Sequence, residues 1–210
     1  MNQRPTFKKV NEHRLEYPSF RYVKVREVKS PIKEGADNAG IDFFVPTDLT
    51  FEQLEKANEK ANLEIEQLNV TAFTSFMGQV AVHVNNQGFI STIWMKPGTR
   101  IIIPSGIKGL LDPIGTMLQA NNKSGVATKK GLIYGAEVVD TSYTGEIHIS
   151  LINTSNKIVS IDADEKIVQF VHIPVLNPTM EEMDHEQFEE IAKEWSARGS
   201  NWQGSTNKNC

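Results

Sequence analysis

The residues most able to do chemistry lie between positions 121 and 146, in the string NNKSGVATKKGLIYGAEVVDTSYTGE. Near its start, Lys123, Ser124 and Gly125 bring together an ammonium group, a hydroxyl and a backbone N–H without a side chain. Such donors can converge on one anion when they share a loop. The string KSG is common in loops, so by itself it permits a phosphate site without requiring one.

A carboxylate and an aromatic ring follow at the other end of this string. Val138 and Val139 lead into Asp140, a turn is expected through Tyr143 and Gly145, and IHISLI resumes the strand pattern, which predicts a β-hairpin. Asp and Gly also occur at hairpin tips for turn geometry alone. The combination favours a ligand with a phosphate and a ring, and an ordinary turn is the alternative.

Five short motifs, taken in order, resemble those of the trimeric dUTPases. NKSGVA and EVVDTSYTGE are similar to the family's second and third motifs, roughly PRSG(L/V)A and GVIDxDYxGE, at a spacing that needs no gap. AGIDFF at 39–44, DEKIVQFV at 164–171 and RGSNWQGST at 198–206 resemble the first, fourth and fifth motifs. Each is weak alone, but the shared order makes the resemblance strong. It covers residues 20–50 and 93–206.

The resemblance implies an all-β, jelly-roll-like core of the β-clip type, within a single domain that spans 1–210. Three segments lie outside the shared core: an N-terminal extension at 1–19, an insertion at 48–90 and a flexible C-terminal arm at 198–210. Short runs punctuated by Pro and Gly independently favour an antiparallel sandwich or barrel. The family also implies a homotrimer in which each site is assembled from more than one subunit.

Several elements are predicted from the patterns themselves. Thr50 and Gln53 form a capping box that begins one amphipathic helix over 50–68, packed on the body or, alternatively, free to bind a partner. A hairpin is predicted over 78–95, and a second, acidic helix over 184–196. Strands are expected at 20–28, 100–103, 106–111, 115–120, 132–139, 146–152, 157–161 and 166–175.

Three residues receive catalytic roles from the resemblance. Asp140 would activate the water that attacks the α-phosphorus of the nucleotide. Asp42, in the first motif, would support a phosphate-binding cation or the waters of a metal. Gln169, in the fourth motif, would offer its amide to a phosphate oxygen. Judged from the residues alone, the first could equally form an Asx turn, the second a strand-start carboxylate and the third an ordinary strand side chain.

The same motifs imply the substrate contacts. Ser124 and Gly125 match the pair that contacts phosphate, whereas Lys123 stands where the family usually has arginine and lacks its bidentate fork. Tyr143 matches the tyrosine that packs against the deoxyribose and excludes a 2′-hydroxyl. Glu137 replaces a glycine in the segment that lines the base pocket, where its side chain either enters the pocket or points to solvent.

In the family the C-terminal arm closes over the nucleotide, with its arginine on the γ-phosphate and its aromatic ring on the base. Here the aromatic residue is a tryptophan, one position earlier than the family's phenylalanine. The matching residues are Arg198, Gly199, Trp202, Gly204, Ser205 and Thr206.

Composition narrows the other possibilities. The net charge of −4 argues against nonspecific nucleic-acid binding, and no apolar run reaches the roughly 20 residues of a membrane span. The single cysteine is the last residue, which excludes an internal disulfide framework and favours the cytoplasm. The histidines are not spaced as pairs of metal ligands, which disfavours a structural zinc site. The resemblance implies Mg²⁺ as the cofactor, held mainly by the triphosphate and waters.

The resulting hypothesis is a dUTP diphosphatase, a Mg²⁺-dependent enzyme that releases dUMP and pyrophosphate from dUTP. The first alternative is a nucleotide-binding or regulatory protein on the same scaffold, with altered base preference or weak activity. In that case the 48–90 insertion is a candidate surface for a protein partner. A related dCTP deaminase is a less favoured class, because no acid–base group for that chemistry can be identified.

Overall fold

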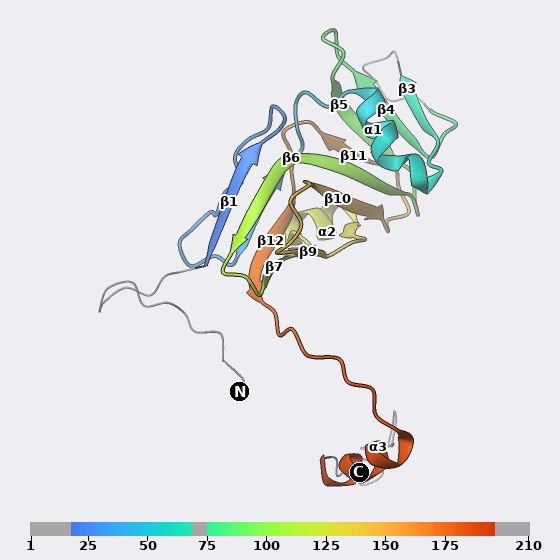
Figure 1. The fold of residues 1–210 in the computed structure, drawn as a ribbon. Helices are drawn as coiled ribbons and strands as arrows, with labels where there is room; N and C mark the ends of the chain where they lie inside the picture. Colours follow the sequence, from blue (N-terminus) through green and yellow to red (C-terminus); the bar gives the residue numbers. More distant parts are fainter. Residues whose placement is uncertain (1–17, 69–74, 196–210) are drawn as a thin grey trace, which may run out of the picture. The chain divides into compact units, whose positions relative to one another are not determined.

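The computed structural model describes residues 18–68 and 75–195 (Figure 1). The chain divides into two compact units, Met1–Val175 and Leu176–Cys210. The first unit contains the described strands and the helices α1 and α2, and the second contains the helix α3. The described residues that position the candidate site belong to the first unit.

The first unit is built mostly from strands. Its elements are β1 (Ser19–Lys24), β2 (Gly40–Phe44), α1 (Phe51–Asn58), the 3₁₀ turn η1 (Glu59–Ala61), β3 (Ile65–Leu68), β4 (Val80–Val84), β5 (Ile90–Met95), β6 (Arg100–Asp112), β7 (Thr116–Asn121), α2 (Ser124–Lys130), β8 (Leu132–Tyr134), β9 (Val138–Asp140), β10 (Glu146–Asn153), β11 (Val159–Asp162) and β12 (Lys166–Pro174). They form three four-stranded sheets, ordered β1-β6-β10-β8, β11-β5-β4-β3 and β2-β12-β7-β9. One hydrophobic core takes side chains from all three sheets, including the fully buried Ile103, Ile93 and Phe170. The predicted all-β fold class is confirmed.

Strand β6 runs through the point where a break was expected, because 100–103 and 106–111 form one strand of 13 residues. Its first part pairs with β10 and its second part with β1. Gly106 permits the bend between them, since its φ of +75° is readily adopted by glycine, and the β10 register shifts close by. Pro104 is tolerated next to such an irregularity, where the ladder does not need its missing N–H.

The helix predicted over 50–68 is shorter than expected. Its capping box is present, with Gln53 N–H donating to Thr50 Oγ1 and Thr50 N–H donating to Gln53 Oε1. The helical structure ends with η1, where Asn62 takes a left-handed conformation with φ +48°. The alternating string LEIEQL that follows suits a strand, so Ile65 lies in β3, which pairs parallel to β4.

The inserted helix α1 packs on the body, as predicted. Leu54 is fully buried. Asn58 bonds the β6 backbone in both directions, with Nδ2 donating to Ile102 O and Oδ1 accepting from Ile102 N–H, each at 2.8 Å. The hairpin predicted over 78–95 is confirmed as the antiparallel pair β4 and β5, with its turn at the expected position. The insertion is thus an integral part of the first unit.

The β-hairpin predicted around Asp140 is wrong, although the turn itself is present. β9 pairs with β7 in one sheet, whereas β10 pairs with β6 and β8 in another. The turn between them, in which Tyr143 N–H donates to Asp140 O at 3.0 Å, carries the chain across. The strand expected over 132–139 divides for the same reason, since β8 and β9 belong to different sheets. Gly135 lies between them against Ser150, whose Oγ would be 2.7 Å from an added Cβ.

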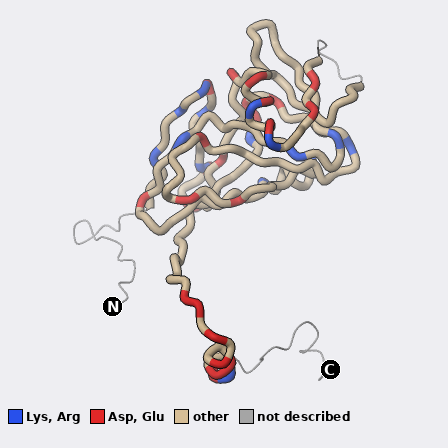
Figure 2. Tube along the Cα trace, turned by 45° about the vertical axis from the view of Figure 1, so that its right-hand side comes forward, with Lys and Arg blue, Asp and Glu red and all other residues tan. Residues whose placement is uncertain are grey.

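The second unit is described as far as its helix α3 (His185–Trp195), which agrees with the helix predicted over 184–196. Asp184 caps it, as Oδ1 accepts from Gln187 N–H at 3.0 Å. Acidic residues recur along this segment, as the red positions in Figure 2 show. None of the described α3 side chains is buried.

Candidate functional site

Three of the predicted site residues meet on adjacent strands of the β2-β12-β7-β9 sheet. Gln169 of β12 pairs with Asp42 of β2 on one side and with Asn121 of β7 on the other. Lys123 follows closely after β7, and its Nζ lies 2.6 Å from Asp42 Oδ1. The sheet register therefore brings the first, second and fourth motifs together.

Asp42 is a buried carboxylate that lies between two lysines. It is 4% exposed, and Lys166 Nζ lies 3.6 Å from its Oδ2. Lys166 also forms an ion pair with Glu34. The hydrogen bond to Glu34 raises the pKa of Lys166, with Asp42 adding to the effect, and Lys166 lowers the pKa of Glu34 in return. Lys166 therefore stays charged beside Asp42.

The Gln169 amide is held by the loop that precedes α2. Its Nε2 donates to Asn122 O at 3.0 Å, and Asn122 Oδ1 accepts from Tyr134 N–H at 3.0 Å. Gly40 faces Gln169 so closely that a Cβ there would lie 2.5 Å from Gln169 Oε1. Hydrogen bonds on both sides thus fix the loop that carries Lys123.

A polar pocket of about 710 Å³ opens at this junction, with Asp42, Lys123 and Gln169 in its wall. Its size lies within the usual range of small-molecule sites. Sequence reasoning missed the rest of the lining, most of which comes from the string SPIKEGADNAG and from the asparagines before Lys123. These residues are Glu34, Asp37, Asn38, Ala39, Gly40, Asn121, Asn122 and Val171.

Ser124 and Gly125 begin helix α2 instead of lying in the predicted loop. Lys123 is the N-cap residue, and Gly131 ends the helix in a left-handed conformation. The N–H groups of a first helical turn have no acceptor within the helix, so they face outward beside Lys123. Nothing lies within 4 Å of a Cβ built on Gly125, which leaves its backbone accessible. The predicted ammonium, hydroxyl and N–H remain adjacent.

Asp140 and Tyr143 lie on the turn between β9 and β10. The Asp140 side chain is exposed, and within the described residues its carboxylate has neither a hydrogen-bond nor an ion-pair partner. Tyr143 is 44% exposed, and its hydroxyl donates to Glu146 O at 2.7 Å. A Cβ at Gly145 would lie 2.6 Å from that hydroxyl, so glycine lets the ring fold over the turn.

Within one chain this turn lies apart from the polar pocket. Asp140 pairs with Met117 of β7, whereas Asn121, further along the same strand, borders the pocket. Four residues at about 3.4 Å each separate the two positions by roughly 14 Å. The predicted catalytic residues therefore form two groups: Asp42 with Gln169 at the pocket, and Asp140 on the turn.

Glu137 lies just before β9 and is exposed, as are its neighbours from 135 to 138. Its carbonyl accepts from Ala120 N–H of β7 at 2.7 Å, so the sheet already uses this backbone oxygen. The Glu137 side chain was expected either to enter the base pocket or to point to solvent, and in a single chain it is in solvent.

An ion pair that sequence reasoning missed supports the turn. Arg26 donates through Nε and Nη2 to the two carboxylate oxygens of Glu146, at 2.7 and 3.1 Å, and Gly106 N–H donates to the same carboxylate at 2.7 Å. The Arg26 and Glu146 side chains are each 15% exposed. The available signal was the motif string TSYTGE, which ends in Glu146. The pair fastens the start of β10 to the segment after β1, and the Gly106 N–H fastens it to the bend in β6.

Part of the predicted site lies outside the described residues, namely Arg198, Gly199, Trp202, Gly204, Ser205 and Thr206. Within 18–68 and 75–195, no group of three or more His, Cys, Asp or Glu side chains is placed to hold a metal ion. Nor does any helix in those ranges have the length and apolar character needed to cross a bilayer.

The fold is that of solved dUTPase structures. A mutant dUTPase of Staphylococcus bacteriophage 80alpha with dUpNHpp matches with a TM-score of 0.58 and 16% identity, over 90% of this chain and 98% of that one. The dUTPase of S. aureus phage phi11 matches with a TM-score of 0.53 and 14% identity, over 80% of this chain and 97% of that one. At these identities the likeness defines the fold class.

Sequence comparison identifies the family. The dUTPase family model matches residues 90–202, more than half of the chain. The deoxyuridine 5′-triphosphate nucleotidohydrolase of Candida albicans is 31% identical over 128 residues, 61% of this chain and 69% of that protein. Its counterpart from Fusobacterium nucleatum is 33% identical over 119 residues, 56% of this chain and 76% of that protein. The match to the Bdellovibrio bacteriovorus protein is 36% identical over 41% of this chain and spans 59% of that relative. This chain belongs to the dUTPase family, which confirms the predicted family and agrees with the predicted enzyme class, dUTP diphosphatase.

Proposed function

We propose that this protein hydrolyses dUTP to dUMP and pyrophosphate, with Asp140 activating the water that attacks the α-phosphorus. The observation that carries the proposal is the exposed Asp140 carboxylate, which has no partner among the described residues and lies in a dUTPase motif. A carboxylate in that state is available to accept a proton from water. The names of the curated relatives support the same substrate.

The triphosphate would bind in the polar pocket at the start of α2. Lys123, oriented by Asp42, supplies a positive charge, while Ser124 and Gly125 supply a hydroxyl and an accessible N–H. Lys123 acts as a point charge, because a lysine lacks the planar fork of arginine. Gln169 keeps one amide hydrogen for a phosphate oxygen, since Asn122 O takes the other.

The proposed cofactor is Mg²⁺, held mainly by the triphosphate and its own waters. The pocket offers carboxylate and amide oxygens, which are the hard ligands this ion prefers, so the donor set fits. Asp42 already faces Lys123 and Lys166, so it would act on the ion through water. A bound Mg²⁺ would neutralise charge on the phosphate oxygens. A phage phi11 dUTPase mutant coordinates a structural Mg(II) ion.

Tyr143 would select the sugar. Its ring is partly exposed and its hydroxyl is fixed on Glu146 O, so the ring can form a wall against the deoxyribose that leaves no room for a 2′-hydroxyl. Glu137 would contribute backbone at the base pocket while its side chain stays in solvent. Arg198 and Trp202 of the arm would close over the γ-phosphate and the base.

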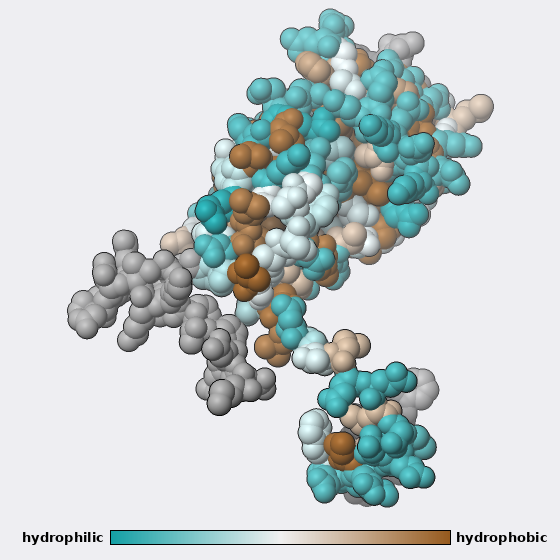
Figure 3. Space-filling model, viewed as in Figure 1, coloured by the Kyte–Doolittle hydropathy of each residue, from teal (hydrophilic) through white to brown (hydrophobic). Residues whose placement is uncertain are grey.

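We also propose a homotrimer with sites shared between subunits. Sharing would bring Asp140 of one copy to the pocket of another, because the β7 positions beside the two groups, Met117 and Asn121, are roughly 14 Å apart in one chain. Exposed apolar side chains on β1, β6 and the loop after β6 are available for burial at subunit contacts, among them Val23, Leu110 and Ile114. Apolar residues, coloured brown, are exposed among hydrophilic ones on the face of the first unit shown in Figure 3.

The proposed setting is the cytoplasm, with the deoxynucleotide as the main partner. A single cysteine at the last position fits a reducing compartment. The net charge of −4 disfavours nucleic acid as a partner.

The test is pyrophosphate release in the presence of Mg²⁺, with dUTP, dTTP, dCTP and UTP compared side by side. Rapid release from dUTP, lost in an Asp140→Asn variant that still binds dUTP, would support the proposal. Release chiefly from another deoxynucleotide would keep the mechanism and overturn the base assignment. No release from any of them would contradict the enzyme.

The second candidate is a nucleotide-binding or regulatory protein on this scaffold. Lysine at position 123, where the family usually has arginine, favours it because lysine lacks the bidentate fork and holds phosphate less precisely. Its protein partner would engage the 48–90 insertion. Tight dUTP binding without pyrophosphate release would support this function over the first.

A further inference from the structure

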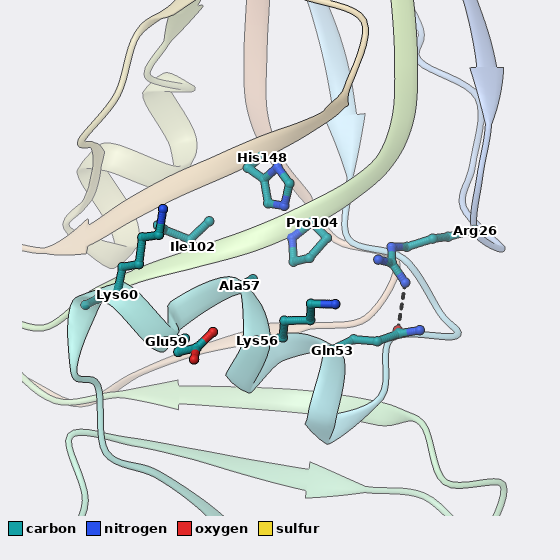
Figure 4. A pocket seen from close by; sticks show the side chains of 10 residues that line it. Arg26, Gln53, Lys56, Ala57, Glu59, Lys60, Ile102, Pro104 and His148 are labelled. Carbon is teal, nitrogen blue, oxygen red and sulfur yellow. Dashed lines mark hydrogen bonds between the residues drawn. The ribbon is translucent and has the colours of Figure 1, made fainter.

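A groove separate from the nucleotide pocket lies between the inserted helix α1 and the strands β6 and β10 (Figure 4). Its volume is about 550 Å³, which is within the range of small-molecule sites. The helix comes from the insertion and the strands from the shared dUTPase core. The groove therefore exists because the insertion packs where it does.

The floor of the groove is apolar and fixed. Ala57 of α1 and Ile102 and Pro104 of β6 form it. The distance between helix and strand is set by Asn58, whose amide makes two 2.8 Å hydrogen bonds to the Ile102 backbone. An apolar floor held by these hydrogen bonds suits the flat face of a ring or a short hydrocarbon.

The groove carries an excess of positive charge along α1. Lys56 of α1 and Lys60 of η1 both line the groove, with Ala57 between them in Figure 4. Glu59 is the acidic residue that α1 and η1 add to the lining. Within the described part of the chain, none of these three side chains makes a hydrogen bond or an ion pair. The two ammonium groups are thus available to an anion.

Arg26 closes one end of the groove as a fixed donor. Its Nη1 donates to Gln53 Oε1 at 2.7 Å, the dashed contact in Figure 4, and its Nε and Nη2 bind Glu146. Gln53 is also the N3 residue of the α1 capping box, with Thr50 as the N-cap. Arg26 therefore joins the start of the inserted helix to the start of β10.

One residue that lines the groove, His148, is connected to the turn that carries Asp140. His148 lies above Pro104 in Figure 4, and its Nδ1 is 2.8 Å from Glu146 O. That carbonyl oxygen is the one that accepts from the Tyr143 hydroxyl. Both Arg26 and His148 thus contact Glu146, one through its carboxylate and the other through its backbone. A molecule in the groove would touch Arg26 and His148, which both contact Glu146, and Glu146 in turn accepts the hydrogen bond of Tyr143.

We propose that this groove is a second binding site, for a small organic anion that carries a phosphate or carboxylate on a flat apolar body. The apolar part lies on Ala57, Ile102 and Pro104, and the charge is taken by Lys56 and Lys60. Competition of the anion for Arg26 loosens the Arg26–Glu146 pair and shifts the turn that holds Tyr143. The effect on hydrolysis rests on the proposed function, whereas the binding itself does not.

The binding test titrates the full-length protein with phenyl phosphate, which combines a ring with a dianion, and follows heat by calorimetry. The Lys56→Gln/Lys60→Gln double variant should bind at least about five-fold more weakly, because both free charges are lost. The matched control, Lys108→Gln/Lys157→Gln, removes two exposed lysines outside the groove and should bind as the wild type does. Unchanged binding by the first variant, or equal loss in both, would overturn the proposal.

The second arm measures dUTP hydrolysis with and without phenyl phosphate. The groove predicts a change in KM or kcat that the Lys56→Gln/Lys60→Gln variant no longer shows, although it hydrolyses dUTP normally in the absence of the probe. Purely competitive inhibition that persists in that variant would place the probe in the nucleotide pocket and contradict the groove. If dUTP is not hydrolysed at all, the proposed function fails and the calorimetric result still decides the groove.

Discussion

The two parts of the candidate site have opposite surroundings. At the pocket junction, Asp42 is buried and its two oxygens face the ammonium groups of Lys123 and Lys166. On the turn after β9, the Asp140 carboxylate is exposed and unpartnered among the described residues. One carboxylate organises its neighbours, and the other is available for chemistry.

This difference shows which part of the site one chain completes by itself. The junction takes its side chains from neighbouring strands whose register fixes them, so the pocket forms when the chain folds. The turn is supported through Tyr143, Glu146 and Arg26, while the Asp140 carboxylate itself stays exposed to solvent. Substitutions in the two parts should therefore separate stability from activity.

Asp140→Asn should give the largest loss of activity at the smallest cost in stability. Removal of a general base lowers turnover on the order of 10²- to 10⁴-fold. Loss of charge from an exposed side chain changes the free energy of unfolding by less than about 0.5 kcal/mol. Pyrophosphate release and urea unfolding measure the two quantities. Turnover close to that of the wild type would show that Asp140 is not the base.

Asp42→Asn should show the reverse balance. Two lysines lose a shared, buried charge partner, which should lower the free energy of unfolding by about 1–3 kcal/mol. Asp37→Asn is the matched control, because Asp37 is exposed in the same pocket and should change that free energy by less than about 0.5 kcal/mol. Equal losses of unfolding free energy in the two variants would show that the buried Asp42 contributes no more to stability than the exposed Asp37.

Arg26→Gln tests the support behind the turn. Glu146 keeps its bond from Gly106 but loses a bidentate partner in a mostly buried place, so the free energy of unfolding should fall by about 1–2 kcal/mol. A double-mutant cycle with Glu146→Gln should give a coupling energy of about 1 kcal/mol. Additive effects would mean that the pair does not stabilise the start of β10.

Tyr143 offers a smaller, sharper comparison. Tyr143→Phe removes one hydroxyl hydrogen bond, about 0.5–1.5 kcal/mol, and keeps the ring. The preference for dUTP over UTP should therefore survive in Tyr143→Phe and fall in Tyr143→Ala. The ratio of kcat/KM for the two nucleotides measures it. An unchanged ratio in Tyr143→Ala would exclude the ring as the wall against the 2′-hydroxyl.

The smallest effect should come from pH, through His172 of β12. Burial lowers the pKa of His172, and its Nε2 lies 2.7 Å from Thr116 Oγ1. Because the folded pKa is below the unfolded value of about 6.5, the unfolded chain binds more protons as pH falls, and stability decreases below that pH. Urea unfolding between pH 7.5 and pH 5.5 should show this slope, reduced in His172→Gln. An identical slope in that variant would assign it to other groups.

His172 also connects the two regions. Thr116, which its ring contacts, accepts a hydrogen bond at its carbonyl from Thr141 Oγ1, next to Asp140. His172 lies on β12, the strand that also carries Gln169. Protonation of His172 would weaken its contact with Thr116, and Thr116 holds Thr141 at the base of the turn. A parallel decrease in unfolding free energy and in kcat over this pH range would support such a connection.

Motif order and strand periodicity sufficed to predict the fold class, the second helix and the hairpin at 78–95, because each has a local signal. Asp42, Lys123 and Gln169 were each named as site residues from separate motifs, but that they meet at one junction was not predicted. The predicted hairpin at Asp140 failed for a physical reason: a turn signal fixes where the chain reverses and does not determine which strands then pair. Sheet membership depends on distant partners such as Met117.

The missed features share that origin. Arg26 lies 120 residues from Glu146 in the sequence, and no local pattern joins an arginine after one strand to a glutamate that opens another. The helix over 50–68 was overextended because Ile65 fits both a helical stripe and an alternating strand. The left-handed backbone of Asn62 ends the helix before Ile65, and hydrophobic periodicity does not predict such a backbone conformation.

The position of β4 has a consequence for how this family can tolerate extra sequence. β5 pairs with β11 on one side and with β4 on the other, so a chain without the insertion would leave one edge of β5 with unpaired backbone groups. Such an edge invites pairing with other molecules. The insertion transfers the outer edge to β3, a four-residue strand that carries Glu66. Excising residues 48–90 would therefore yield a protein prone to aggregate, whereas shortening the Asn85–Gly88 turn would leave the sheet covered.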